Sequence, residues 1–229
     1  MQHPTITAES LLTLAETNIS RGLLAEAEEA LQRLVKQTPS KWQSAAKLPD
    51  GNIQIAFWNE QEYHDYLLYF KEQQVGKVLT HVYPSYAKAY YLLSALAVEQ
   101  KDLSRASVYI NRALELEPDH PEILCEKALI MNHLGHLKDA YELYVNAVYS
   151  RAWNSNMIQA KAMRGAGIVL EELGNLDAAA VMLKKSLQLE PANQVAMNEL
   201  SHIYLQRMTQ QNNHSAVTRP WWKFWQKNT

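Results

Sequence analysis

The sequence lacks most of what small redox, metal-binding and nucleotide-binding folds depend on. Its only cysteine is Cys125, so the 229 residues can form neither an internal disulfide nor a CxxC site. It has seven glycines and no strong alternation of apolar and polar residues, which argues against a β-rich or Rossmann-type fold. A single free thiol fits a reducing compartment, so we expect a cytoplasmic location.

Long apolar runs and catalytic motifs are absent as well. No run approaches the roughly 18 apolar residues of a membrane span, and the N-terminus does not join a basic stretch to an apolar one as a signal peptide does. No GxSxG or HExxH sequence occurs, and Gly165 and Gly167 lie inside a helical pattern, not in a phosphate-binding loop. We therefore expect no catalytic residues, no cofactor and no enzymatic activity.

One histidine pair, His133 and His136, flanks Gly135, with Cys125 two helical turns upstream. Zinc is held by about four ligands, and this group has no carboxylate or second thiol to complete such a set. We expect no metal site and assign both histidines to a turn at the surface.

Acidic residues are missing from the C-terminal end. Residues 200–229 contain Arg207, Arg219, Lys223 and Lys227 but no Asp or Glu. Taking these four cations from the formal charge of -2 leaves -6 on residues 1–199, so the body is acidic and its end basic. The nearly balanced total gives no reason to expect a nucleic-acid partner.

The most informative stretch is residues 87–120, which reads as two helices and a turn. Apolar residues one helical turn apart predict amphipathic helices before and after Lys101. Asp102 is expected to cap the second helix, and Pro118 to end the unit because proline cannot continue a helix. Ala106 is small enough for two helix backbones to approach closely. Neither helix can bury its apolar stripe alone, so each needs a neighbour.

The same pattern returns in residues 121–154 and 160–193, and residues 194–208 begin a fourth copy as a lone closing helix. Gly135 and Gly174 stand where the first copy has Lys101. A period of 34 residues with this order of small, bulky and proline positions resembles the tetratricopeptide repeat family. The resemblance implies an all-α fold, an α-α superhelix whose core is built by contacts between neighbouring units.

The chain divides into four parts on this basis. Residues 1–48 are predicted to form a similar helical pair and then, from a capping box of Ser40 and Gln43, the start of another helix over residues 41–48. Residues 49–86 are an irregular insertion or a degenerate repeat. Residues 87–208 hold the three units and the closing helix, and residues 209–229 a polar linker and a tryptophan-rich basic tail.

The insertion has features of its own. Residues 53–58 alternate and are rich in β-branched and aromatic side chains, which favours a short β segment. That segment could pair with residues 75–82 or with a second chain, and both alternatives stay open. Asn59 and Glu62 are expected to cap a helix that follows. The many aromatic residues here are more typical of core filling than of a ligand cage.

A second irregularity precedes the third unit, where the five extra residues 155–159 shift the register. Either the preceding helix runs on or the next one starts early.

In arrays of the tetratricopeptide repeat family the first helix of each unit lines a concave groove, so the resemblance places a mixed set of side chains there. Apolar contact to a peptide is expected from Tyr91, Cys125, Leu129 and Ile168. Lys161, Arg164 and Asn198 are expected to hold a carboxylate or backbone carbonyls by charge-assisted hydrogen bonds. The alternative is that some of these side chains only pack against the next helix. The predicted groove residues are Lys88, Tyr91, Cys125, Leu129, His133, Lys161, Arg164, Ile168, Asn198 and His202.

Chaperone-binding members of the family hold an acidic C-terminal tail with lysine and asparagine on successive first helices. Lys161 and Arg164 fit such a clamp, but Tyr91, Ala95 and Glu126 stand where it needs lysine or asparagine. The clamp is incomplete, so the resemblance gives little support to binding of a chaperone tail.

The basic tail concentrates aromatic residues beside its cations. Tryptophan together with lysine and arginine favours the interface between membrane and water. Docking onto the repeats and recognition by another protein are equally open. The predicted tail-contact residues are Trp221, Trp222, Phe224 and Trp225.

The sequence therefore predicts a non-catalytic interaction scaffold or adaptor that binds a protein or peptide partner in its groove. The alternative is a peripheral membrane assembly factor whose tail contacts a bilayer.

Overall fold

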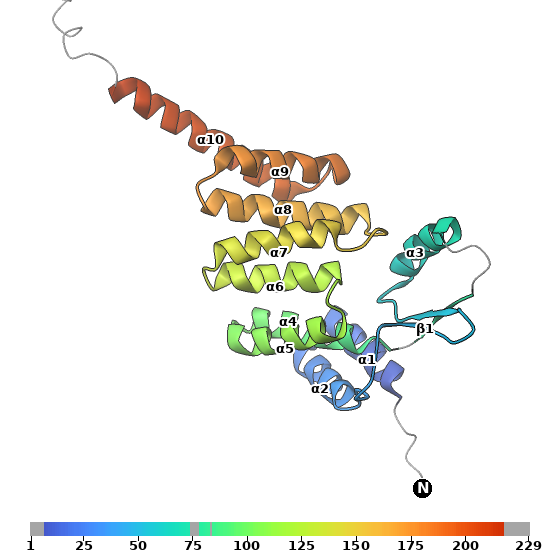
Figure 1. Ribbon diagram of the computed structural model, residues 1–229. Helices are drawn as coiled ribbons and strands as arrows, with labels where there is room; N and C mark the ends of the chain where they lie inside the picture. The colour runs from blue at the N-terminus through green and yellow to red at the C-terminus, as the bar shows by residue number, and fades with distance from the viewer. Residues whose placement is uncertain (1–6, 74–77, 83, 218–229) are drawn as a thin grey trace, which may run out of the picture.

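The computed structural model describes residues 7–73, 78–82 and 84–217. Helices stacked in pairs make up most of the structure, with α1 and α10 at opposite ends of the stack (Figure 1). The stacked helices are α1 (Ala8–Ser20), α2 (Leu24–Val35), α4 (Tyr86–Glu99), α5 (Leu103–Leu116), α6 (Pro121–His133), α7 (Leu137–Tyr149), α8 (Asn156–Glu172), α9 (Leu176–Leu189) and α10 (Gln194–Val217). Each odd-numbered member from α5 to α9 packs on the helix before it and on the one after it. The predicted all-α superhelix is confirmed.

The turn inside each unit ends one helix and starts the next by the same local means. Gly135 and Gly174 adopt φ of +79° and +78°, and Lys101 takes the equivalent left-handed conformation with φ of 61°. Asp102 caps α5, its Oδ1 accepting a hydrogen bond of 3.0 Å from the backbone N–H of Arg105. α5 ends at Leu116, two residues before Pro118, as predicted.

Small residues stand where neighbouring helices cross. Ala106, Ala140 and Ala179 are 0% exposed. Gly165 of α8 lies so close to α7 that an added Cβ would be 2.4 Å from the ring of Tyr144, and one on Gly167 would be 2.8 Å from Cγ of Leu183. The helix contacts therefore depend on these positions staying small.

The insertion forms a lobe beside the stack (Figure 1). Its elements are β1 (Ala45–Lys47), β2 (Ile53–Ile55), α3 (Glu60–Gln73) and β3 (Leu79–His81). β2 lies in the middle, antiparallel to β1 with Ala46 opposite Gln54, and parallel to β3 with Gln54 opposite Thr80. The predicted β segment therefore pairs within the chain, with the stretch proposed for it.

The predicted helix over residues 41–48 is wrong, because these residues make a turn and strand β1. The backbone N–H of Trp42 bonds to the carbonyl of Pro39 at 3.1 Å, and the ring of Trp42 packs edge-on against Tyr86 at 5.6 Å. Pairing with β2 then satisfies the backbone groups that a helix would have satisfied internally. Tertiary contacts thus outweigh the helix propensity of Ala45, Ala46 and Lys47.

Aromatic side chains fill the core of the lobe, as predicted. Phe57, Tyr66 and Phe70 are buried, with Ile53 and Ile55 packed against them. Asn59 caps α3, its Oδ1 accepting from the backbone N–H of Glu62 at 2.9 Å.

The C-terminal end departs from the prediction in one respect. α10 continues to Val217, so residues 209–217, predicted as a linker, are helical.

The register shift before the third unit arises because α8 starts early, which was one of the two predicted alternatives. α8 begins at Asn156, with Ser155 as its cap. The predicted contact residues Trp221, Trp222, Phe224 and Trp225 lie outside the described residues. Within residues 7–73, 78–82 and 84–217, no helix has the length and apolar character needed to cross a membrane.

Candidate binding site

The first helices of successive units lie side by side and form one continuous surface, which we call the first-helix face. α4 contacts α6, α6 contacts α8, and α8 contacts α10. Polar side chains connect them: Lys161 of α8 pairs with Glu122 of α6, and Asn132 Nδ2 of α6 donates to Glu172 Oε1 of α8 at 3.2 Å. The predicted groove residues on α6, α8 and α10 therefore lie on neighbouring helices.

The N-terminal end of this face is covered by the insertion. Trp58 is buried there, its ring 5.0 Å from that of Tyr91 and stacked on His120 at 3.6 Å and 17°. Lys88 donates to the backbone carbonyl of Trp58 and pairs with Glu16. Lys88 and Tyr91 are thus half-buried and contact the insertion.

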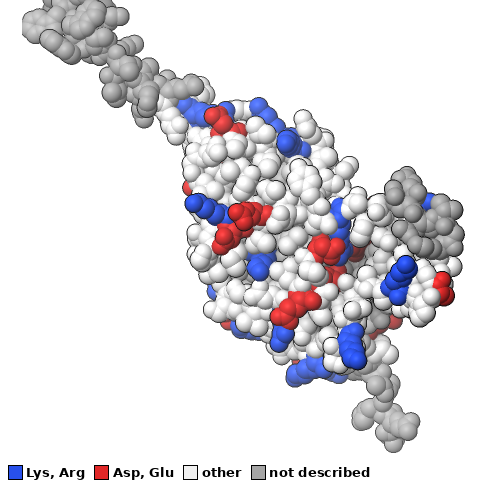
Figure 2. Space-filling view, viewed as in Figure 1, with Lys and Arg blue, Asp and Glu red and all other residues white. Residues whose placement is uncertain are grey.

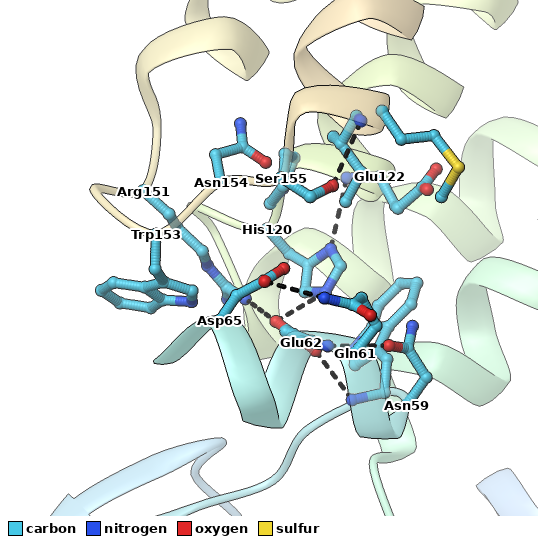
Figure 3. A pocket seen from close by; sticks show the side chains of 14 residues that line it. Asn59, Gln61, Glu62, Asp65, His120, Glu122, Arg151, Trp153, Asn154 and Ser155 are labelled. Carbon is cyan, nitrogen blue, oxygen red and sulfur yellow. Dashed lines mark hydrogen bonds and ion pairs between the residues drawn. The ribbon is translucent and has the colours of Figure 1, made fainter. Parts of the chain in front are cut away.

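A buried ionic cluster, here the Arg151 cluster, fastens the insertion to the repeats (Figure 3). Arg151, from the loop between α7 and α8, lies 2.6 Å from Glu62 Oε1 of α3, 3.2 Å from Glu117 Oε2 and 3.1 Å from Asp119 Oδ1. Its side chain is only 9% exposed and that of Glu117 only 1%. Three separate parts of the chain therefore meet at one guanidinium.

Neutral groups complete the coordination of the buried carboxylates. Glu117 Oε1 accepts hydrogen bonds from Ser85 Oγ at 3.0 Å and from Trp58 Nε1 at 3.3 Å. Glu62 Oε2 accepts from the backbone N–H of Trp58 at 2.8 Å. Burial alone would raise the pKa of Glu62, but the hydrogen bond and charge of His120, with the charge of Arg151, outweigh it, so the pKa is lowered.

A cavity of about 70 Å³ lies next to the cluster, between the starts of α3, α6 and α8 (Figure 3). Two buried donor atoms of its lining, Arg151 Nε and Trp153 Nε1, have no hydrogen-bond partner among the described residues, whereas His120 Nε2 faces Glu62 Oε1 at 3.5 Å. The space is large enough to admit water, because one water needs only about 10–15 Å³ of cavity measured in this way. The cavity belongs to a structural joint and is too small for a peptide.

Comparison with known proteins identifies the repeated unit. The sequence model described as "Tetratricopeptide repeat" matches residues 87–120 and 165–193, which lie in the units α4 with α5 and α8 with α9. The chain is a tetratricopeptide-repeat protein. No curated protein matches its sequence.

Solved structures share the fold of these tetratricopeptide repeats. The structure of PilF from Pseudomonas aeruginosa has a TM-score of 0.61 at 13% identity, over 88% of this chain and 69% of that one. A double mutant of MamA (RS-1) has a TM-score of 0.55 at 13% identity, over 92% of this chain and 90% of that one. A crystal structure of MamA has a TM-score of 0.53 at 19% identity, over 82% and 81%. At these identities the likeness shows the fold alone.

The remaining predicted groove residues differ in how open they are. His133, Asn198 and His202 are exposed, whereas Cys125 is buried and burial raises the pKa of its thiol to about 12. Cys125 is thus a core residue and not a reactive thiol.

The two predicted cations are already paired. Arg164 lies 2.9 Å from Glu190 Oε2. Lys161 is paired with Glu122, and although burial would lower the pKa of Lys161, Tyr91 and Glu122 outweigh it and raise the pKa. A carboxylate from a partner would have to compete with these internal acids.

Leu129 and Ile168 stand out among the predicted residues. Both are half-buried apolar side chains on first helices. Among the described residues, the apolar side chains that pack against the hydrophobic clusters do not include either of them. Each of them keeps part of its apolar surface exposed.

Residues of the joint were missed by sequence reasoning. Arg151 and Trp153 lie where the second unit lacks its closing proline, and that irregularity was the only sign of them. Glu117 precedes Pro118 like an ordinary helix end, and nothing local shows that its carboxylate is buried.

Proposed function

We propose that the protein is a non-catalytic interaction scaffold that binds a protein or peptide partner on the first-helix face between α6 and α10. The observation that carries the proposal is the pair of half-buried apolar side chains, Leu129 and Ile168, on adjacent first helices outside the hydrophobic clusters of the described residues. Apolar groups presented in this way, among polar neighbours, are typical of a peptide-binding surface.

The covered end of the face sets the length of the site. Because Trp58 occupies the surface next to Tyr91, a partner contacts α6, α8 and α10 and not α4. Figure 2 shows basic and acidic side chains interspersed on the visible face, without a broad area of one sign. We therefore infer a partner segment that relies on apolar contact, supported by hydrogen bonds to exposed groups such as Asn198 and His202.

The experiment starts from a displayed library of random peptides selected on the immobilised full-length chain. The affinity of enriched peptides is then measured for the wild type and for Ile168→Glu. Placing a charge in the apolar part of the site should weaken binding at least about tenfold, which corresponds to about 1.4 kcal/mol. Circular dichroism shows whether the variant keeps its helices.

Val181→Glu is the matched control. Val181 is 52% exposed on α9, the second helix of its unit. Replacing this apolar residue by Glu therefore introduces the same charge outside the proposed site. Binding should be unaffected by it. Equal affinity of wild type and Ile168→Glu, or a loss confined to Val181→Glu, would remove the first-helix face from the proposal.

A second candidate function, contact with a membrane surface, is favoured by the end of α10. Leu205 is 62% exposed and Met208 60% exposed on the stretch of helix that leads to residues 218–229. We propose for this case a cytoplasmic protein that associates peripherally with anionic bilayers through residues 218–229. Co-sedimentation with vesicles of mixed neutral and anionic lipid tests it, and a chain ending at residue 217 should stay in the supernatant. Equal sedimentation of the full and shortened chains would exclude a role for residues 218–229.

A further inference from the structure

Three side chains that are far apart in the sequence converge where α8 meets α10. Glu171 comes from α8, and Glu199 and His202 from α10. One oxygen or nitrogen atom of each lies within 4.8 Å of the others, and His202 Nδ1 is 2.7 Å from Glu171 Oε1. Glu199 and His202 are three positions apart, so they project from the same side of their helix.

The charge of this group is not balanced by neighbouring cations. Among the described residues, the ion pairs of Lys and Arg do not include Glu171 or Glu199, and the one basic neighbour of Glu171 is the imidazole of His202. A bound cation would compensate both charges.

We propose that Glu171, Glu199 and His202 form a binding site for a divalent transition-metal ion of the zinc type. One imidazole nitrogen with two carboxylate oxygens is a donor set found at zinc, whereas calcium and magnesium prefer oxygen ligands alone. Water fills the remaining position. The site shares His202 with the proposed peptide surface, but binding of the ion needs no peptide partner.

The geometry needs only small side-chain movements to close around an ion. Bond lengths of about 2.0–2.2 Å place neighbouring ligand atoms of a tetrahedral zinc about 3.3–3.6 Å apart. The side chain of His202 is 60% exposed and free to exchange its contact with Glu171 for the metal. Gln206 Nε2 donates to Glu171 Oε1 at 3.0 Å and orients that carboxylate from outside the ligand set.

An ion at this position joins the closing helix to the third unit. α10 otherwise contacts α8 through few residues and relies mainly on α9. We therefore expect metal binding to reduce opening of α10, as any ligand that binds only the folded state does.

Calorimetric titration of the untagged full-length chain with Zn²⁺ tests the site. The wild type should bind one ion, and His202→Ala or Glu199→Gln should lose that binding. Gln206→Ala, which removes only the orienting group, should weaken it about 10- to 100-fold. Co²⁺ in place of Zn²⁺ gives a visible absorption band that reports nitrogen and oxygen ligation.

His133→Ala with His136→Ala is the matched control, because neither histidine belongs to the group of three converging ligands. Their loss should leave the titration unchanged. Absence of saturable binding to the wild type would overturn the proposal. Equal binding by wild type, His202→Ala and Glu199→Gln, or loss only in the control, would overturn it as well.

Discussion

Lys101 shows how one residue can deviate from a repeated turn without changing it. The same two hydrogen bonds close all three turns: the N–H of Lys101 bonds to Val98 and that of Asp102 to Ala97, at 2.9 Å each, as Gly135, Gly174 and their successors do. A side chain in the left-handed region costs roughly 1–2 kcal/mol, which glycine avoids. Lys101 is exposed and gains nothing evident in return.

Lys101→Gly should therefore stabilise the protein by about 1 kcal/mol, after allowing for the greater freedom of glycine in the unfolded chain. Urea unfolding measures it. Gly174→Ala is the counterpart, since its φ is +78° and the added Cβ meets nothing within 4 Å. It should destabilise by about 1 kcal/mol through conformation alone. Destabilisation by Lys101→Gly together with stabilisation by Gly174→Ala would contradict this explanation of the turns.

Gly165 is a second residue whose role depends on its neighbour. In an isolated helix, alanine is more favourable than glycine by about 1 kcal/mol. Here the Cβ would lie 2.4 Å from the Tyr144 ring, and overpacking of this kind costs about 1–3 kcal/mol. Gly165→Ala should thus destabilise, against its helix propensity, and Tyr144→Leu in the same chain should recover part of the loss. Additive effects of the two changes would show that the residues do not compete for space.

At the level of elements, the features that depend on local residue chemistry could be predicted from the sequence. The helix pairs, the Asp102 cap and the small crossing residues followed from spacing and residue type. Strand β1 did not, because Ala45, Ala46 and Lys47 prefer a helix and only the partner β2 makes them a strand. The Arg151 cluster was equally hidden, since its acids come from α3 and from the end of α5. The groove was predicted as open along its length, and Trp58 shows that its first part is covered.

The Arg151 cluster should decide whether the insertion stays attached. Arg151→Ala leaves Glu62 and Glu117 buried without their partner, a change that typically costs about 3–5 kcal/mol. The loss should appear locally, as faster proteolysis within residues 49–83, while the repeats keep their helical signal. Arg112→Ala is the control, because Arg112 pairs with Glu115 on an exposed helix face where the pair contributes little. Equal proteolysis of both variants would contradict a role for the cluster in fastening the insertion.

The same cluster predicts a dependence on pH. Despite burial, His120 and Arg151 hold the pKa of Glu62 below its ordinary value of 4.5. A lowered carboxyl pKa stabilises the folded state fully above that value, and the contribution is lost as pH falls through the folded pKa. Glu62→Gln should lower stability at neutral pH and reduce the loss of stability on acidification. Parallel curves of unfolding free energy against pH for the two proteins would contradict the assignment.

At the scale of the whole molecule, the insertion and the repeats divide the first-helix face into a covered and an open part. The covered part is made by Trp58 with Tyr91 and Lys88, and the open part by α6, α8 and α10. Residue types alone could not make this division, because Lys88 and Tyr91 suit a groove as well as Leu129 and Ile168 do. The arrangement predicts where a partner lies.

Hydrogen exchange of the complex with a selected peptide tests that arrangement most directly. Slower amide exchange and shielding from side-chain labelling should be confined to residues 121–133, 156–172 and 194–210, with α7, α9 and the insertion unchanged. Protection centred on α7 and α9, or on residues 45–81, would contradict binding to the open part of the first-helix face.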